Sequence, residues 1–232
     1  MKNIAPVFAL LVLNLILESV QAQGTFQNLD FEAATVLPLP PGQAETSVTV
    51  SAAFPSWIAY KGTNVTSTVS HNGLSSGGVV LSILGPSFSP RLQGDFTALL
   101  QAGGLSSSFP VYSAALAQTG TVPSGILSIM FYSLGDRPEV TFNGQLIPTA
   151  LLGNGISSSG GATYEILGGD IASYAGQSGE LRFTSYAPQG QFGSSTLLDN
   201  IFFSNQQVPE PSVFCLFGVG ALMLCRRLQK QI

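Results

Sequence analysis

The chain has 232 residues, only 9% of them charged, and its 12 acidic residues outnumber the 8 basic ones. This weakly charged, acidic balance excludes nucleic acid as a partner, because binding to phosphates requires clustered lysines and arginines. Both cysteines, Cys215 and Cys225, lie near the C-terminal end. The part of the chain before them therefore has no disulfide framework.

Residues 1–22 have the three-region layout of a secretory signal peptide. Lys2 supplies a positive charge, residues 4–17 are almost wholly apolar, and Val20 and Ala22 place suitable residues before a cut that precedes Gln23. We expect a helical signal peptide that is removed on export. The alternative is an uncleaved N-terminal anchor, which Glu18 and the small-residue site disfavour.

Residues 23–204 are predicted to form one exported β domain. Turn residues punctuate this region every eight to twelve positions, and the segments between them are short and apolar. Strands are expected at 47–53, 79–84, 126–132, 139–142, 180–185 and 197–203. Asn143-Gly144 predicts a two-residue hairpin turn and Asn72-Gly73 a second turn. Helix is expected only at 95–101 and as a single turn at 169–174, so the pattern indicates an all-β, antiparallel sandwich or barrel.

Four segments in this domain carry a resemblance. They are residues 26–32 (FQNLDFE), 117–123 (AQTGTVP), 174–183 (YAGQSGELRF) and 197–203 (LLDNIFF). Their order resembles jelly-roll β-sandwiches of the galactose-binding and carbohydrate-binding-module type. The resemblance implies that the first and last strands pair and that the two middle segments begin inner strands.

The same resemblance implies a structural calcium ion near the paired terminal strands. Asp30, Glu32 and Asp199 are its candidate ligands, since calcium takes carboxylate and carbonyl oxygens. The alternative is that Glu32 and Asp199 accept hydrogen bonds from backbone donors at strand ends.

A ligand platform for sugars requires exposed aromatic rings, because sugars stack their C–H faces on flat rings. Trp57 and Tyr60 are the candidates, and their spacing of three places them on opposite faces of a strand. The alternative for Trp57 is a place in the core. Tyr112, Tyr132 and Tyr186 are further candidates without any pattern.

No catalytic residues are predicted. His71 is the only histidine and lies in a probable turn, which makes a serine–histidine–carboxylate triad a poor prospect. No metal-binding or phosphate-binding motif is present either. We therefore expect a protein that is not an enzyme. The alternative is a secreted hydrolase that acts on polysaccharide with acidic residues of the sandwich.

The C-terminal end has three parts. Residues 205–211 are expected to form a linker that contains Pro209, Glu210 and Pro211. Residues 212–228 are expected to form a transmembrane helix, and residues 229–232 a basic cytoplasmic end that follows Arg226 and Arg227. A buried C-terminal helix of a soluble domain is the alternative, which the two prolines and two arginines disfavour.

Together these parts resemble a PEP-CTERM sorting domain. The resemblance implies that an exosortase cuts near Pro209-Glu210-Pro211. It also implies a Gram-negative host that makes extracellular polysaccharide. The protein would then stay transiently in the inner membrane before reaching the cell surface or extracellular matrix, where it is expected to bind polysaccharide.

Overall fold

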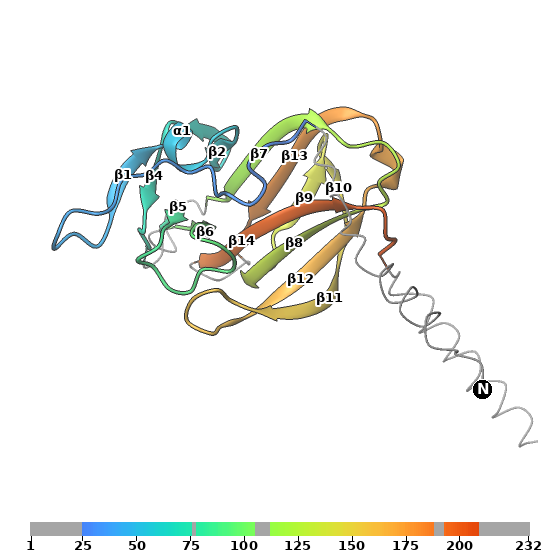
Figure 1. The fold of residues 1–232 in the computed structure, drawn as a ribbon. Helices are drawn as coiled ribbons and strands as arrows, with labels where there is room; N and C mark the ends of the chain where they lie inside the picture. Colours follow the sequence, from blue (N-terminus) through green and yellow to red (C-terminus); the bar gives the residue numbers. More distant parts are fainter. Residues whose placement is uncertain (1–24, 76–77, 105–111, 188–192, 209–232) are drawn as a thin grey trace, which may run out of the picture.

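Two β-sheets stack face to face in the computed structural model, which describes residues 25–75, 78–104, 112–187 and 193–208 (Figure 1). The eight-stranded sheet has the order β1 (Thr46–Thr49), β4 (Thr68–His71), β5 (Val80–Leu84), β6 (Thr97–Gly103), β14 (Gly193–Ser204), β8 (Ser128–Gly135), β12 (Thr163–Asp170), β11 (Thr149–Ile156). The six-stranded sheet has the order β10 (Gln145–Leu146), β9 (Glu139–Phe142), β13 (Ser178–Ser185), β7 (Ala114–Thr121), β2 (Ile58–Lys61), β3 (Asn64–Thr66). The described helices are short: α1 (Val50–Ala53) and the 3₁₀ turn η1 (Ala172–Tyr174). The all-β prediction is confirmed.

From β6 to β9, consecutive strands alternate between the two sheets. β14 then lies between β6 and β8 in one sheet, and β13 lies between β7 and β9 in the other. This interleaving agrees with the expected jelly roll. The pairing is antiparallel except between β4 and β5, which run parallel. The expectation of a purely antiparallel sandwich is wrong at that one pair.

The hydrophobic core fills the space between the sheets, because alternate side chains of each strand point inward. Phe183 on β13 meets Phe131 on β8 edge to face, with ring centroids 5.2 Å apart. Trp57 lies beside Phe183 and Phe31 in the same cluster. The aromatic rings therefore join the two sheets.

Local signals predicted some elements correctly. β9 has the expected bounds, and Asn143 and Gly144 turn into β10 with φ values of 50° and 75°. The helix expected at 95–101 is wrong. That segment contributes to β6, which is buried at all seven positions between β5 and β14, so sheet pairing overrides its helical composition.

The strand expected at 47–53 ends early. Residues 50–53 turn into α1, whose first turn is capped by the Thr49 hydroxyl accepting from the Ala52 N–H.

The first and last segments, expected to pair as strands, share only a backbone contact. Residues 26–32 form no strand, because Asn28 and Phe31 have positive φ values of 50° and 61° that interrupt an extended chain. The Ile201 N–H still donates to the Leu29 carbonyl at 2.9 Å. The segment at 174–183 does begin an inner strand, β13, whereas the segment at 117–123 forms the end of β7 and not its beginning.

Among the described residues, no helix is long and apolar enough to cross a membrane. The expected signal peptide, the Pro209-Glu210-Pro211 motif, the transmembrane segment, and Arg226 and Arg227 all lie outside the described residues. The first part of the expected linker lies on the sandwich: the Ser128 hydroxyl donates to the Gln206 carbonyl at 2.7 Å, and Val208 is buried.

Candidate functional site

A groove of about 620 Å³ lies on the outer face of the six-stranded sheet, at the end where β2 turns into β3. Its lining residues are Tyr60, Gly62, Thr63, Tyr112, Ser113, Arg182, Thr184 and Tyr186. They come from three regions of the chain that are distant in sequence. The groove therefore depends on sheet pairing rather than on one local motif.

Alanines on the central strand β7 let larger side chains from its two neighbouring strands meet above it. Ala115 pairs with Tyr60 of β2 on one side and with Thr184 of β13 on the other. Residues in direct register point to the same face of a sheet, so Ala115 lies on the outer face with these larger side chains. Its exposure is only 1%, so it lies beneath its larger neighbours and is not one of the residues that line the groove.

Tyr60 is held in place by a cation. The Arg182 guanidinium lies 4.0 Å from the centroid of the Tyr60 ring. Arg182 Nε also donates to Glu180 Oε1 at 2.9 Å, which orients the guanidinium along the strand. An aromatic ring and a charged hydrogen-bond donor therefore sit together at the groove wall.

Two further tyrosines present their rings to solvent. Tyr112 is 43% exposed and Tyr186 is 54% exposed. Tyr112 lies against Gly62, where an added Cβ would come within 2.9 Å of the ring and where φ is +63°. Burial of its hydroxyl raises the pKa of Tyr186, and the negative charge of Glu139 adds to this shift. The hydroxyl is therefore a neutral donor and acceptor at pH 7.

Of the two predicted platform residues, only Tyr60 lines the groove. Trp57 is 4% exposed, and its Nε1–H donates to the Asn28 carbonyl at 2.9 Å inside the core. Trp57 therefore lies in the core and is not part of an exposed platform. Tyr132 is elsewhere, on the eight-stranded sheet, where it stacks on Tyr164 at 4.6 Å.

The candidate calcium ligands act as hydrogen-bond acceptors. Asp199 is fully buried and accepts from the Thr97 hydroxyl at 2.7 Å and from backbone N–H groups at Gln93 and Asn200. Burial raises the pKa of Asp199 to about 7, against the opposing effect of these hydrogen bonds, and the charge of Glu32 adds to the rise.

Glu32 accepts from the N–H groups of Asp95 and Phe96, and Asp30 accepts from the Glu32 N–H. No cluster of three metal-binding side chains occurs in the described part of the chain. These contacts match the alternative in which Glu32 and Asp199 accept hydrogen bonds from backbone N–H groups. Calcium binding itself stays a prediction.

Sequence reasoning missed Arg182 and the role of the β7 alanines in letting Arg182 reach Tyr60. The predicted strand at 180–185 does place Arg182 and Thr184 on one face by alternation, and that signal was available. Nothing local indicates that this face meets Tyr60 across β7.

Comparison of the chain with protein-family models and with curated proteins gave no match. Among solved structures, one described as TmCBM61 in complex with β-1,4-galactotriose is similar at a TM-score of 0.39 and 13% identity. The alignment covers 80% of this chain and 100% of that chain. At this TM-score the likeness carries no weight for the ligand or the site.

Proposed function

We propose that the protein is an exported, non-catalytic surface or matrix protein whose sandwich binds extracellular polysaccharide. The observation that carries this proposal is the groove lined by Tyr60, Tyr112 and Tyr186 together with Arg182. Tyrosine rings offer flat apolar faces for the C–H faces of sugars, and their hydroxyls and the guanidinium of Arg182 offer hydrogen bonds to sugar hydroxyls.

The charges at the groove favour a neutral polysaccharide. Arg182 is already paired with Glu180, and Glu139 adds a negative charge beside Tyr186. An acidic sugar chain would meet this carboxylate and an overall negative protein, whose formal net charge is −4. Uncharged sugars avoid that repulsion.

The spacing of the two carboxylates nearest the groove disfavours hydrolysis at this site. Glu139 pairs with Thr184, four residues along β13 from Glu180. At about 3.3 Å per residue, the two carboxylates on this face stand roughly 13 Å apart along the strand. Glycoside hydrolysis uses carboxyl pairs about 5–9.5 Å apart.

Titration calorimetry with the extracellular polysaccharide of the producing bacterium tests the groove. Tyr60→Ala is expected to weaken binding about tenfold, whereas Tyr132→Ala, the same change on the other sheet, should leave it unaltered. Equal affinities for the wild type and Tyr60→Ala would contradict the proposal. Release of reducing ends during incubation would instead favour the hydrolase.

Delivery is the second part of the proposal. Pro209, Glu210 and Pro211, the apolar run at 213–225, and Arg226 with Arg227 support processing by an exosortase. Intact mass of the mature protein in hosts with and without that enzyme is the test. A product ending near residues 208–211 only when the enzyme is present would support sorting. A full-length membrane form in both hosts would make the tail a plain anchor.

A further inference from the structure

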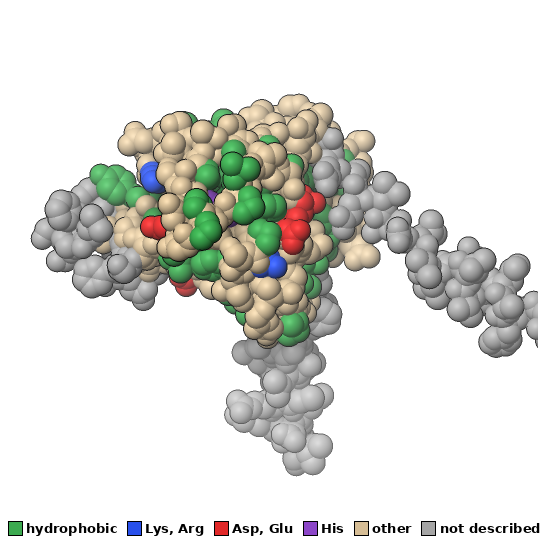
Figure 2. All heavy atoms as spheres, turned by 60° about the vertical axis from the view of Figure 1, so that its left-hand side comes forward, with side chains coloured by type: hydrophobic (Ala, Val, Ile, Leu, Met, Phe, Trp, Pro, Cys, Tyr) green, Lys and Arg blue, Asp and Glu red, His purple; other side chains and the backbone are tan. Residues whose placement is uncertain are grey.

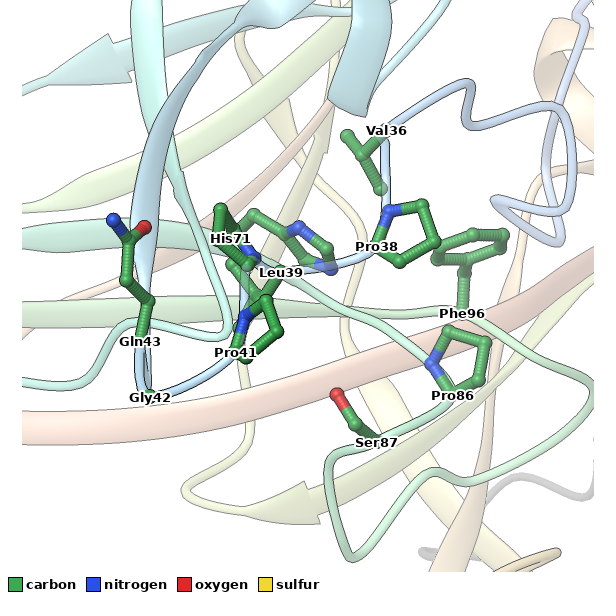
Figure 3. A pocket seen from close by; sticks show the side chains of 11 residues that line it. Val36, Pro38, Leu39, Pro41, Gly42, Gln43, His71, Pro86, Ser87 and Phe96 are labelled. Carbon is green, nitrogen blue, oxygen red and sulfur yellow. The ribbon is translucent and has the colours of Figure 1, made fainter.

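A second pocket, of about 460 Å³, lies on a different part of the molecule from the tyrosine groove. The loop before β1, the end of β4 and the segment between β5 and β6 enclose it (Figure 3). Its walls are mostly apolar and include Val36, Pro38, Leu39, Pro41, Pro86 and Phe96. Figure 2, in which the side of the molecule with β1 and β4 comes forward, shows hydrophobic side chains gathered on this surface.

Among the described residues, the polar side chains in this wall are Gln43 and Ser87, which are exposed, and His71, at the end of β4. Its side chain is almost fully buried, with 2% exposure, yet neither Nδ1 nor Nε2 has a hydrogen-bond partner among the described residues. Burial lowers the pKa of His71, so its imidazole is neutral at pH 7 and has one N–H donor and one acceptor nitrogen. Leaving such buried groups unpaired costs free energy, so a ligand that forms a hydrogen bond with the imidazole would recover part of that cost.

The polar groups around His71 are already paired with one another. Asn72 Oδ1 accepts from the Gly85 N–H at 2.7 Å, and Asn72 Nδ2 donates to the Ser87 hydroxyl at 3.0 Å. Gly85 lets the backbone pack closely against the ring, because an added Cβ there would lie only 2.7 Å from His71 Nε2. The neighbours thus pack against the imidazole without supplying its hydrogen bonds.

We propose that this pocket binds a small apolar ring that carries one hydroxyl, of the phenol class, with the hydroxyl hydrogen-bonded to His71. A hydroxyl both donates and accepts, so it pairs with either nitrogen of a neutral imidazole. The proline and phenylalanine walls match an apolar ring, and none of the described residues that line the pocket has a charged side chain to hold an ionic ligand. The volume lies in the range of small-molecule sites.

Nuclear magnetic resonance of the full chain labelled with ¹⁵N-histidine tests this proposal directly. His71 is the only histidine, so its two ring nitrogens give one assignable set of signals. Phenol is the probe, and toluene is the matched control because it has the same ring and lacks the hydroxyl. Phenol is expected to bind saturably, to shift a His71 ¹⁵N signal, and to bind about tenfold more tightly than toluene.

Variants separate the hydrogen bond from the shape of the pocket. His71→Leu should bind phenol and toluene equally, and Gly85→Ala, whose Cβ would come within 2.7 Å of Nε2 and displace the ring, should weaken phenol binding. Tyr60→Ala, in the polysaccharide groove, should leave phenol binding unchanged. Equal affinity of the wild type for phenol and toluene, or no shift of the His71 signals at saturating phenol, would overturn the proposal, and neither result depends on a variant that folds.

Discussion

Asp199 is expected to make the stability of this protein fall as pH rises from about 4 to about 7. Its pKa is raised from 3.8 to about 7 by burial, so in this window the folded protein keeps a proton that the unfolded chain has released. A state that holds more protons is favoured at low pH, so the free energy of unfolding decreases through the window. At about 1.36 kcal/mol per pKa unit, the loss amounts to roughly 4 kcal/mol.

Urea denaturation followed by tryptophan fluorescence measures this loss, since Trp57 is the single tryptophan and lies in the core. Asp199→Asn keeps the shape of the side chain and removes its titration. The variant also loses a carboxylate oxygen that accepts from Gln93 and Thr97, which costs about 1–3 kcal/mol at every pH.

The quantity to compare is the stability of the wild type minus that of the variant, measured in EDTA. It should fall by roughly 4 kcal/mol between pH 4 and pH 8. The buried His71, whose pKa is lowered, contributes with the opposite sign below its ordinary value of 6.5, and this contribution cancels in the difference. A difference that stays flat, or that grows with pH, would refute the reasoning.

Three further predictions concern calcium, the groove and the core. Millimolar Ca²⁺ at pH 7 should raise the melting temperature of the wild type and not of Asp199→Asn; no shift in either would remove the calcium proposal. Gly62→Ala should displace Tyr112 and weaken polysaccharide binding, with a strain cost of about 1–2 kcal/mol. Gly176 also has a positive φ, of +77°, but lies in open space. Gly176→Ala should therefore show a similar loss of stability in denaturation curves and keep full polysaccharide binding. Phe183→Ala should lower the free energy of unfolding by about 3–5 kcal/mol in urea titrations, and a loss under 1 kcal/mol would contradict its place in the core.

Short-range chemistry explains why parts of the fold were predictable from the sequence. Asn143 and Gly144 accept positive φ at low cost, so the hairpin after β9 follows from two residues. β6 could not be recognised in this way. Its residues have helical composition, and only the strands on both sides of Thr97–Gly103 make an extended chain the better solution.

The candidate site was less predictable than the fold because its residues are brought together by the pairing of strands that are distant in sequence. Tyr60 stood out as an aromatic residue on a strand, but Arg182 looks like an ordinary surface cation in the sequence. The two meet because β2 and β13 both pair with β7, whose Ala115 and Ala117 are too small to separate them. A single sequence contains no local signal for that long-range pairing.

The contact between Leu29 and Ile201 has a consequence for the order in which the molecule forms. Phe26, Leu29 and Phe31 are buried core residues near the start of the described chain, while Ile201 belongs to the last strand. The hydrogen bond between these two segments can form only once the closing strand is present. Topologies with such distant contacts fold slowly. A chain that is threaded across a membrane from its N-terminal end would stay incompletely folded until its last strand emerged.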